Sequence, residues 1–278
     1  MKRFVAGDSV EDAVRATRSL IDAGLAVSLD HLGEDTTEVV HAKATTAAYL
    51  TLLDQLAAAD LAPKAEVSVK LSAVGQALDH SLAIDNAREI CAAAQHAGTT
   101  VTLDMEDHTT TDATLASLCE LRVDFPTVGA VVQSYLHRTE ADCRDLAFAG
   151  SRVRLCKGAY KEPESVAYQR KEDVDASYTR CLDVLMNGDG YPMVATHDPA
   201  LVAVAEEMVA RNDREPDSYE FQMLYGIRPD EQTRLAGEGR TMRVYVPYGD
   251  EWYGYLMRRM AERPANVRFF LRALATRS

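Results

Sequence analysis

Short runs of apolar, often β-branched residues alternate with longer segments of helical spacing along the whole chain. Runs of this length between turn signals predict buried β-strands, and apolar residues at every third or fourth position predict helices. Clear helical patterns cover 42–60 and 80–98, and the second ends in a glycine stop signal. One extra helix is expected over about 9–23, ahead of the first strand. The eight expected strands are 26–32, 66–72, 100–106, 129–135, 152–158, 192–198, 219–224 and 242–247.

Each expected strand is followed by an expected helix, without a break in the alternation. Strict alternation of this kind predicts parallel strands joined by right-handed crossovers. A closed barrel of eight strand–helix units needs about 250 residues, and the chain has 278. We therefore expect a single (βα)₈ barrel domain over 1–278, because the sequence shows no domain boundary, repeat or low-complexity tract.

Most of the expected strands begin apolar and finish polar. Parallel strands buried on both faces would otherwise read as continuous apolar runs. In a barrel the carboxyl ends of all strands meet at one face, where the active sites of this fold lie. The convergence of so many polar strand ends therefore predicts a functional site there. The polar residues are Lys70; Asp104, Glu106, Asp107 and His108; Gln133; Arg154 and Lys157; Thr196, His197 and Asp198; Glu220 and Gln222; and Tyr245.

Composition narrows the function classes. With 43 acidic and 30 basic residues the formal net charge is −13, which argues against nucleic-acid binding. The five cysteines are scattered without a Cys-x-x-Cys pair, as in reduced cytosolic proteins without a zinc site. No apolar run approaches the roughly 20 residues of a membrane span. We expect a cytoplasmic protein, with at most a peripheral contact at the inner membrane.

Three chemistries could use the polar strand ends. A metal hydrolase would gather histidines and carboxylates, and DMEDH (104–108) and THD (196–198) supply some, but there is no His-x-His pair. A Schiff-base lyase would need an activated lysine, for which Lys70 and Lys157 qualify. A dinucleotide site of the G-x-G-x-x-G type is not indicated, because no such motif follows a strand. A barrel can still hold a flavin with side chains and backbone groups at its strand ends.

Two adjacent arginines near the C-terminal end of the sequence are a further feature. In the segment YVPYGDEWYGYLMRRMAERP, helical spacing places Tyr255, Arg258, Arg259 and Glu262 on one face. Trp252, Leu256 and Met260 form an apolar stripe beside it. Paired guanidinium groups at the edge of a packed stripe indicate an acidic ligand.

Five segments together resemble the proline dehydrogenase family, in its monofunctional bacterial branch. They are VSVKLSA (67–73), RVRLCKGAYKEP (152–163), ATHD (195–198), EFQMLYG (220–226) and RVYVPYGDEWYGYLMRRMAERPAN (243–266). The resemblance implies a distorted (βα)₈ barrel that binds FAD, with the final helix over the active-site mouth. It also implies oxidation of L-proline to Δ¹-pyrroline-5-carboxylate by hydride transfer to FAD, as the first step of proline catabolism to glutamate. Electrons would pass to a membrane quinone, and no metal would be needed.

The resemblance also implies roles for single residues of this sequence. Arg258 and Arg259 would grip the substrate carboxylate with help from Lys70, and Asp104 would interact with that lysine. Glu34 would act as a gate by pairing with an arginine of the last helix. Walls around the substrate ring would come from Tyr160, Leu224, Tyr245 and Tyr255, and a tyrosine at 245 favours proline over hydroxyproline. The flavin would be held by Met105, Gln133, Arg154, Cys156, Lys157, Gly158, Ala159, Thr196 and His197.

Within that set, Arg154 and Lys157 would stabilise negative charge on the reduced flavin. Arg154, Asp104 and Lys70 are therefore the expected catalytic residues. Two positions depart from the family pattern, since Cys156 stands where an aliphatic residue is expected and Lys161 where bifunctional relatives carry tryptophan. The alternatives are a Schiff-base lyase on the same barrel with Lys157 as nucleophile, and an inactive barrel that serves as a binding module.

Overall fold

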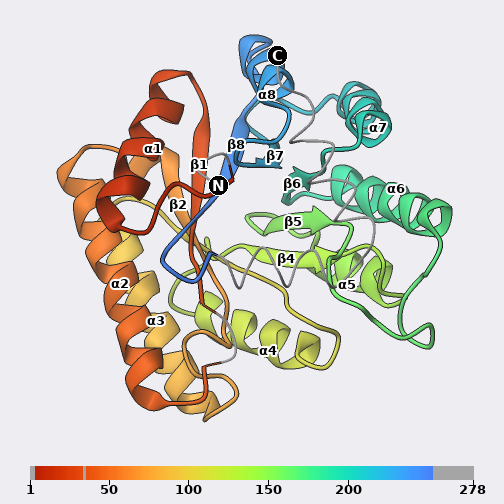
Figure 1. Cartoon of the computed structure of the whole chain (residues 1–278). Helices are drawn as coiled ribbons and strands as arrows, with labels where there is room; N and C mark the ends of the chain where they lie inside the picture. Colours follow the sequence, from red (N-terminus) through yellow and green to blue (C-terminus); the bar gives the residue numbers. More distant parts are fainter. Residues whose placement is uncertain (1–3, 34–35, 253–278) are drawn as a thin grey trace.

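A computed structural model describes residues 4–33 and 36–252. Eight strands alternate with helices through these residues (Figure 1). The strands are β1 (Ala26–His31), β2 (Ala65–Val69), β3 (Val101–Leu103), β4 (Ala130–Gln133), β5 (Arg152–Cys156), β6 (Tyr191–Ala195), β7 (Glu220–Leu224) and β8 (Met242–Tyr248). The helices are α1 (Val10–Asp22), α2 (Val39–Ala58), the 3₁₀ turn η1 (Ala62–Lys64), α3 (His80–His96), α4 (Thr111–Arg122), α5 (Thr139–Leu146), α6 (Lys171–Asn187), α7 (Pro199–Arg211) and α8 (Pro229–Gly237).

The strands form one parallel sheet in the order β3-β2-β1-β8-β7-β6-β5-β4. A bridge between Thr102 and Gly129 joins the two outer strands, with Leu103 N donating to Gly129 O at 2.9 Å. The approach is so close that a Cβ on Gly129 would lie 2.7 Å from Thr102 Oγ1. A glycine is therefore needed at the seam, and the sheet curls into a nearly closed barrel. The expected (βα)₈ fold is confirmed.

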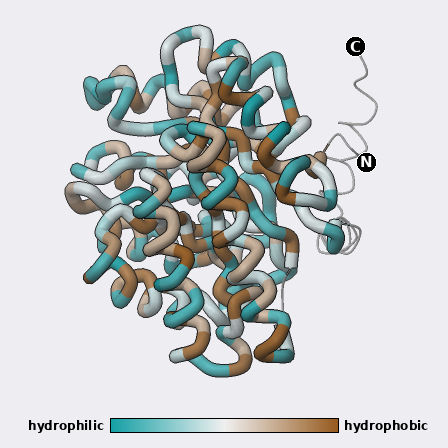
Figure 2. Tube along the Cα trace, turned by 90° about the vertical axis from the view of Figure 1, so that its left-hand side faces the viewer, coloured by the Kyte–Doolittle hydropathy of each residue, from teal (hydrophilic) through white to brown (hydrophobic). Residues whose placement is uncertain are grey.

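The helices surround the strands (Figure 1). The extra N-terminal helix is present as α1 and packs against α2, β1 and β8. It begins with a capping box, in which the Ser9 side chain accepts from Asp12 N and the Asp12 carboxylate accepts from Ser9 N. Hydrophilic and hydrophobic residues alternate along the helices in Figure 2, as expected for helices with one face on a core. Within 4–33 and 36–252, no helix combines the length and the apolar character that crossing a membrane requires.

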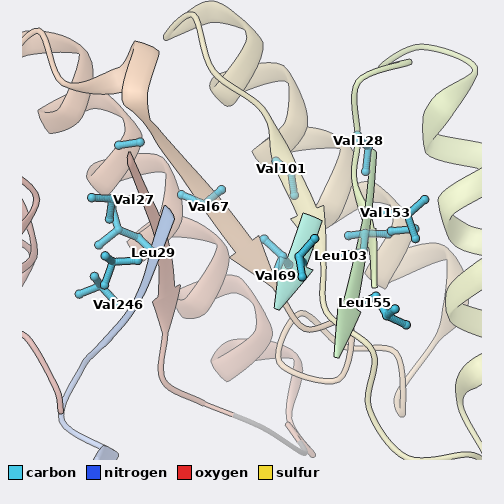
Figure 3. Close-up of a cluster of buried hydrophobic side chains, with 14 of the residues drawn as sticks. Val27, Leu29, Val67, Val69, Val101, Leu103, Val128, Val153, Leu155 and Val246 are labelled. Carbon is cyan, nitrogen blue, oxygen red and sulfur yellow. The ribbon is translucent and has the colours of Figure 1, made fainter. Parts of the chain in front are cut away.

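Apolar and polar residues alternate along β1, β2, β5, β7 and β8, whereas β4 (AVVQ) begins apolar and ends polar. The apolar residues point outward and pack with the helices in one core (Figure 3). Members of this core on the strands include Val27, Leu29, Val67, Val69, Val101, Leu103, Val153, Leu155 and Val246. The positions between them, such as Ser28, Ser68 and Arg154, are buried and polar. Polar residues are therefore present within the strands as well as at the predicted strand ends, because the barrel interior is itself polar.

Side chains of opposite charge fill the part of this interior that lies toward the amino ends of the strands. Glu66 of β2 accepts from Arg152 Nη2 at 2.6 Å, and Arg243 Nε donates to Glu220 at 2.7 Å. Arg154 lies 3.4 Å from Glu66. Burial alone would raise the pKa of Glu66, but the three guanidinium groups outweigh it and lower this pKa to about 2. A cavity of about 340 Å³ opens beside these groups, at the amino ends of the strands.

Candidate active site

At the opposite end of the barrel, two cations and two carboxylates lie in one cluster. Lys70, just past β2, donates to Asp30 Oδ2 at 2.6 Å and lies 3.8 Å from Asp104 Oδ2. Asp104, just past β3, accepts from Arg154 Nη1 at 2.6 Å and from the Tyr245 hydroxyl at 2.7 Å. These residues come from five strands or strand ends (β1, β2, β3, β5 and β8), so only the closed barrel brings them together. We call Asp30, Lys70, Asp104, Arg154 and Tyr245 the mouth cluster.

Arg154 is the most connected side chain of the mouth cluster. Its guanidinium carbon also lies 5.3 Å from the centre of the Tyr245 ring, within the range of a cation–π contact. Burial opposes its charge, but Asp104 and Glu66 outweigh burial and raise the pKa of Arg154. Arg154 is therefore a fixed, buried cation. Besides Asp104, its hydrogen-bond acceptors are Gln222 Oε1 at 2.5 Å, Ser68 Oγ at 3.0 Å, Ser28 Oγ at 3.2 Å and Glu66 Oε1 at 3.4 Å.

A second polar group lines the carboxyl ends of β4, β5 and β6, which are neighbours in the sheet. Gln133 pairs with Cys156 in the register of β4 and β5, and its Nε2 donates to Glu106 O at 2.7 Å. Thr196 and His197 follow β6 directly. The His197 Nε2 atom accepts from Leu224 N at 2.8 Å, so this nitrogen carries no proton. Burial, helped by Arg228 and Lys157, lowers the pKa of His197 to about 4, and the ring is neutral at ordinary pH.

The loop after β5 is held tightly over this edge. Gly158 has a φ of +104°, and a Cβ there would lie 2.2 Å from the Tyr135 ring, so no other residue fits. Further along the loop, buried Glu162 accepts from His108 N at 2.9 Å and from the Tyr135 hydroxyl at 3.2 Å. Its carboxylate also contacts His108 Nδ1. The loop therefore presents backbone groups in a fixed conformation.

Lys157 begins the same loop and is surrounded by carboxylates. Its Nζ atom lies 2.5 Å from Asp175 Oδ1 and 2.9 Å from Asp198 Oδ2. Asp198 also caps α7, where its side chain accepts from Ala200 N at 3.1 Å. The Lys157 side chain is thus held between two carboxylates.

The remaining expected site residues divide into two groups. Met105, Ala159, Tyr160 and Leu224 lie at or just past the carboxyl ends of β3, β5 and β7, on the same face of the barrel as the mouth cluster. Glu34, Tyr255, Arg258 and Arg259, together with the final helix, lie outside the described residues. In the described part of the chain, no three His, Cys, Asp or Glu residues are grouped so that they could hold a metal ion.

Comparison with known proteins decides the family. A family model described as proline dehydrogenase matches residues 13–272. The chain belongs to the proline dehydrogenase family. Proline dehydrogenase of Deinococcus radiodurans is 41% identical over 278 residues, which cover 98% of this chain and 89% of that protein. Proline dehydrogenase 1 of Bacillus subtilis is 38% identical over 273 residues, which cover 98% of this chain and 90% of that protein.

A solved structure agrees with this assignment. Proline utilization A from Bdellovibrio bacteriovorus, inactivated by N-propargylglycine, matches with a TM-score of 0.85 and 25% identity. The match covers 93% of this chain and 32% of that chain. Proline dehydrogenase membership makes the protein an oxidoreductase of proline catabolism.

Sequence reasoning missed several residues of this proline dehydrogenase barrel. Asp30 was not among the predicted residues, because the expected strand 26–32 ends in the apolar Leu32 and so does not read as a polar strand end. The two-residue alternation in that strand places Asp30 on the same side as Ser28, opposite Val27 and Leu29, and this was the available signal. Glu162 carried no such signal, because only the fold brings it to His108.

Proposed function

We propose that this chain oxidises L-proline to Δ¹-pyrroline-5-carboxylate with FAD as its bound cofactor. The observation that carries the proposal is the mouth cluster beside the polar ends of β4, β5 and β6. One group offers fixed cations for a small carboxylate, and the other offers hydrogen-bonding groups for a flavin. The family match supports proline as the substrate class.

The residues present fit a flavin. The tight turn at Gly158 packs its backbone directly against the Tyr135 ring and so fixes the loop after β5, and Gln133, Thr196 and neutral His197 are uncharged hydrogen-bonding groups at the ends of adjacent strands. Met105, Cys156, Lys157 and Ala159 complete the proposed cradle. When bound, the flavin supplies the acceptor for a hydride. The choice of FAD over FMN comes from the family.

The mouth cluster would bind and orient the substrate. Proline offers one carboxylate, which Lys70, Arg258 and Arg259 would clamp through charge-assisted hydrogen bonds. Tyr245 donates its hydroxyl to Asp104, so its ring is fixed and can form a wall. Tyr160, Leu224 and Tyr255 would form the other walls, with Glu34 as gate. The C–H bond beside the ring nitrogen then breaks with its electron pair, the nitrogen loses a proton, and a C=N bond forms.

Arg154 would provide the electrostatic stabilisation of this step. It is buried and held by Asp104, Gln222 and Ser68, so its charge needs no reorganisation during the reaction. Together with Lys157 it would offset the negative charge that arrives with the hydride. We also propose that the electrons then pass to a membrane quinone, at a peripheral contact with the inner membrane.

A Schiff-base lyase with Lys157 as nucleophile is less well supported. Such a lysine must be uncharged to attack a carbonyl group. Lys157 Nζ instead lies within 2.9 Å of two carboxylates, which engage it in ion pairs.

The visible spectrum of the purified protein tests the proposed function. We expect a yellow protein whose flavin absorbance is bleached when L-proline is added without oxygen, because the hydride reduces the flavin. D-proline is the control. A colourless protein that borohydride traps covalently with its substrate would establish the lyase instead, and a yellow protein that L-proline leaves unchanged would indicate a binding module.

Substitution of Arg258 or Arg259 by methionine tests the carboxylate clamp. We expect the KM for L-proline to rise about 10- to 100-fold, because a hydrogen bond to a charged group is worth roughly 1.5–3 kcal/mol. The flavin content should stay unchanged. Arg144→Met, which alters an exposed arginine paired with Glu140, is the matched control. Loss of flavin with an unchanged KM would contradict the assigned role.

A further inference from the structure

Asp30 and Lys70 form a buried ion pair within the mouth cluster. Lys70 Nζ donates to Asp30 Oδ2 at 2.6 Å, and the two residues are only 4% and 0% exposed. They come from adjacent strands, because Asp30 is paired with Ser68 in the register of β1 and β2. Asp30 has no exposed surface from which to reach a substrate. Lys70 lies two residues beyond Ser68, the register partner of Asp30, and is therefore nearer the carboxyl-end face of the barrel.

The two carboxylates near Lys70 are not equivalent. Asp104 is 3.8 Å from Lys70 and already accepts from Arg154 and from Tyr245. Asp30 is nearer, and its Oδ1 atom is buried with no hydrogen-bond partner among the described residues. The charge of Asp30 is therefore directed mainly at Lys70, with the Tyr245 hydroxyl as a lesser partner, while the charge of Asp104 is shared among three groups.

We propose that Asp30 is a positioning residue that keeps Lys70 protonated and aimed at the substrate carboxylate. The inference rests on the proposed function, because it needs Lys70 to bind the carboxylate of proline. A lysine buried without a partner tends to lose its proton, since burial disfavours the charged form. A carboxylate at hydrogen-bond distance reverses that tendency and also restricts the rotamers of the long side chain.

Among the described residues near the ion pair, Lys70 is the group whose protonation we expect Asp30 to affect above neutral pH, because three of its neighbours carry no charge there. Burial raises the pKa values of Tyr49 and Tyr248 and lowers that of His31, so all three are uncharged in that range. Burial also raises the pKa of Asp30 itself, and Lys70 opposes this. The charged and titratable groups that face the pair are His31 and Tyr248 of β1 and β8, Tyr49 of α2, Asp104, Arg154 and Tyr245.

The pH dependence of proline binding in Asp30→Asn tests the proposal. We expect the KM for L-proline to rise about tenfold at neutral pH, as when the outer partner of a ligand-binding group is lost, with a smaller change in kcat. The KM should rise further with pH and should begin to do so at a lower pH than in the unmodified protein, because Lys70 loses its proton earlier. Asp30→Glu keeps the charge, so the pH at which the KM begins to rise should return toward that of the unmodified protein.

A second readout does not depend on turnover. Tetrahydrofuran-2-carboxylate has an ether oxygen in place of the proline nitrogen and cannot become an imine, so its binding can be followed by the flavin spectrum across the same pH range. In Asp30→Asn its dissociation constant should likewise begin to rise at a lower pH than in the unmodified protein. In a Lys70→Met background, the Asp30→Asn change should weaken binding less than twofold, because Asp30 acts through the lysine.

Each outcome separates the two proposals. If the unmodified protein is neither reduced by L-proline nor able to bind the ring acid, the proposed function fails. If it does both, but Asp30→Asn raises KM by one factor at every pH, or by the same factor with and without Lys70, then Asp30 is only structural. Should Asp30→Asn not fold, Asp30→Glu and the Asp30→Asn/Lys70→Met double variant give the same comparison, since neither leaves a single unpaired charge. A double variant that binds the ring acid more than twofold more weakly than Lys70→Met alone would overturn the role, because Asp30 would then act without the lysine.

Discussion

Substitution of Asp104 by asparagine should lower kcat/KM for L-proline about 100-fold, the usual scale for losing one preorganised electrostatic contact. The carboxylate joins Arg154, Tyr245 and Lys70 at 2.6, 2.7 and 3.8 Å. An amide of the same size leaves both cations without that charge and offers the guanidinium a weaker acceptor. Steady-state kinetics on samples matched for flavin content would measure the effect.

Two further variants test whether the loss of kcat/KM comes from the Asp104 carboxylate. Tyr245→Phe removes one hydrogen bond to Asp104 but keeps the carboxylate, so the loss should be nearer tenfold. Asp112→Asn makes the same chemical change at an exposed carboxylate on α4 and should leave the kinetics unchanged. If Asp104→Asn retained kcat/KM within threefold, the mouth cluster would not be the substrate site.

Substitution of Glu66 by glutamine should lower the free energy of unfolding by about 3–5 kcal/mol at neutral pH, the cost of removing one partner from a buried ionic group. Arg152, Arg154 and Arg243 all lie within 3.9 Å of this carboxylate. Without it, three guanidinium groups share the interior with less negative charge. Urea unfolding of flavin-saturated protein would measure the change, and Glu140→Gln on the surface should cost less than about 1 kcal/mol.

The pH dependence of this effect has a definite sign. The pKa of Glu66 in the folded chain is about 2, below its ordinary value of 4.5. The carboxylate therefore stabilises the fold fully above pH 4.5 and loses that contribution as pH falls toward 2. The difference in unfolding free energy between the unmodified protein and Glu66→Gln should shrink over this range. A difference that stays constant with pH would mean that the charge of Glu66 does not stabilise the barrel.

The fold was predictable because it depends on local and repetitive patterns. The alternation of short apolar runs with helical segments needs no long-range information, and each expected strand overlaps an observed one. The side of each strand that would be polar was less predictable. Val27 and Leu29 face the helices while Ser28 and Asp30 face the interior, and a mixed run of this kind reads as one apolar strand with a polar end. The roles assigned to the site residues stay predictions.

What the sequence by itself determined is the kind and order of the elements, the family, and which residue types stand at the strand ends. Side-chain periodicity and chain length are sufficient for these. Which charges meet was decided only by the closed barrel, because Lys70 reaches Asp30 across one strand pair and Arg154 reaches Asp104 across the interior. Such partners are 40 and 50 residues apart in the chain, and nothing in their local sequence specifies the pairing. The physical reason is that a buried charge must find an opposite charge within a few ångströms, and only tertiary structure determines which one is there.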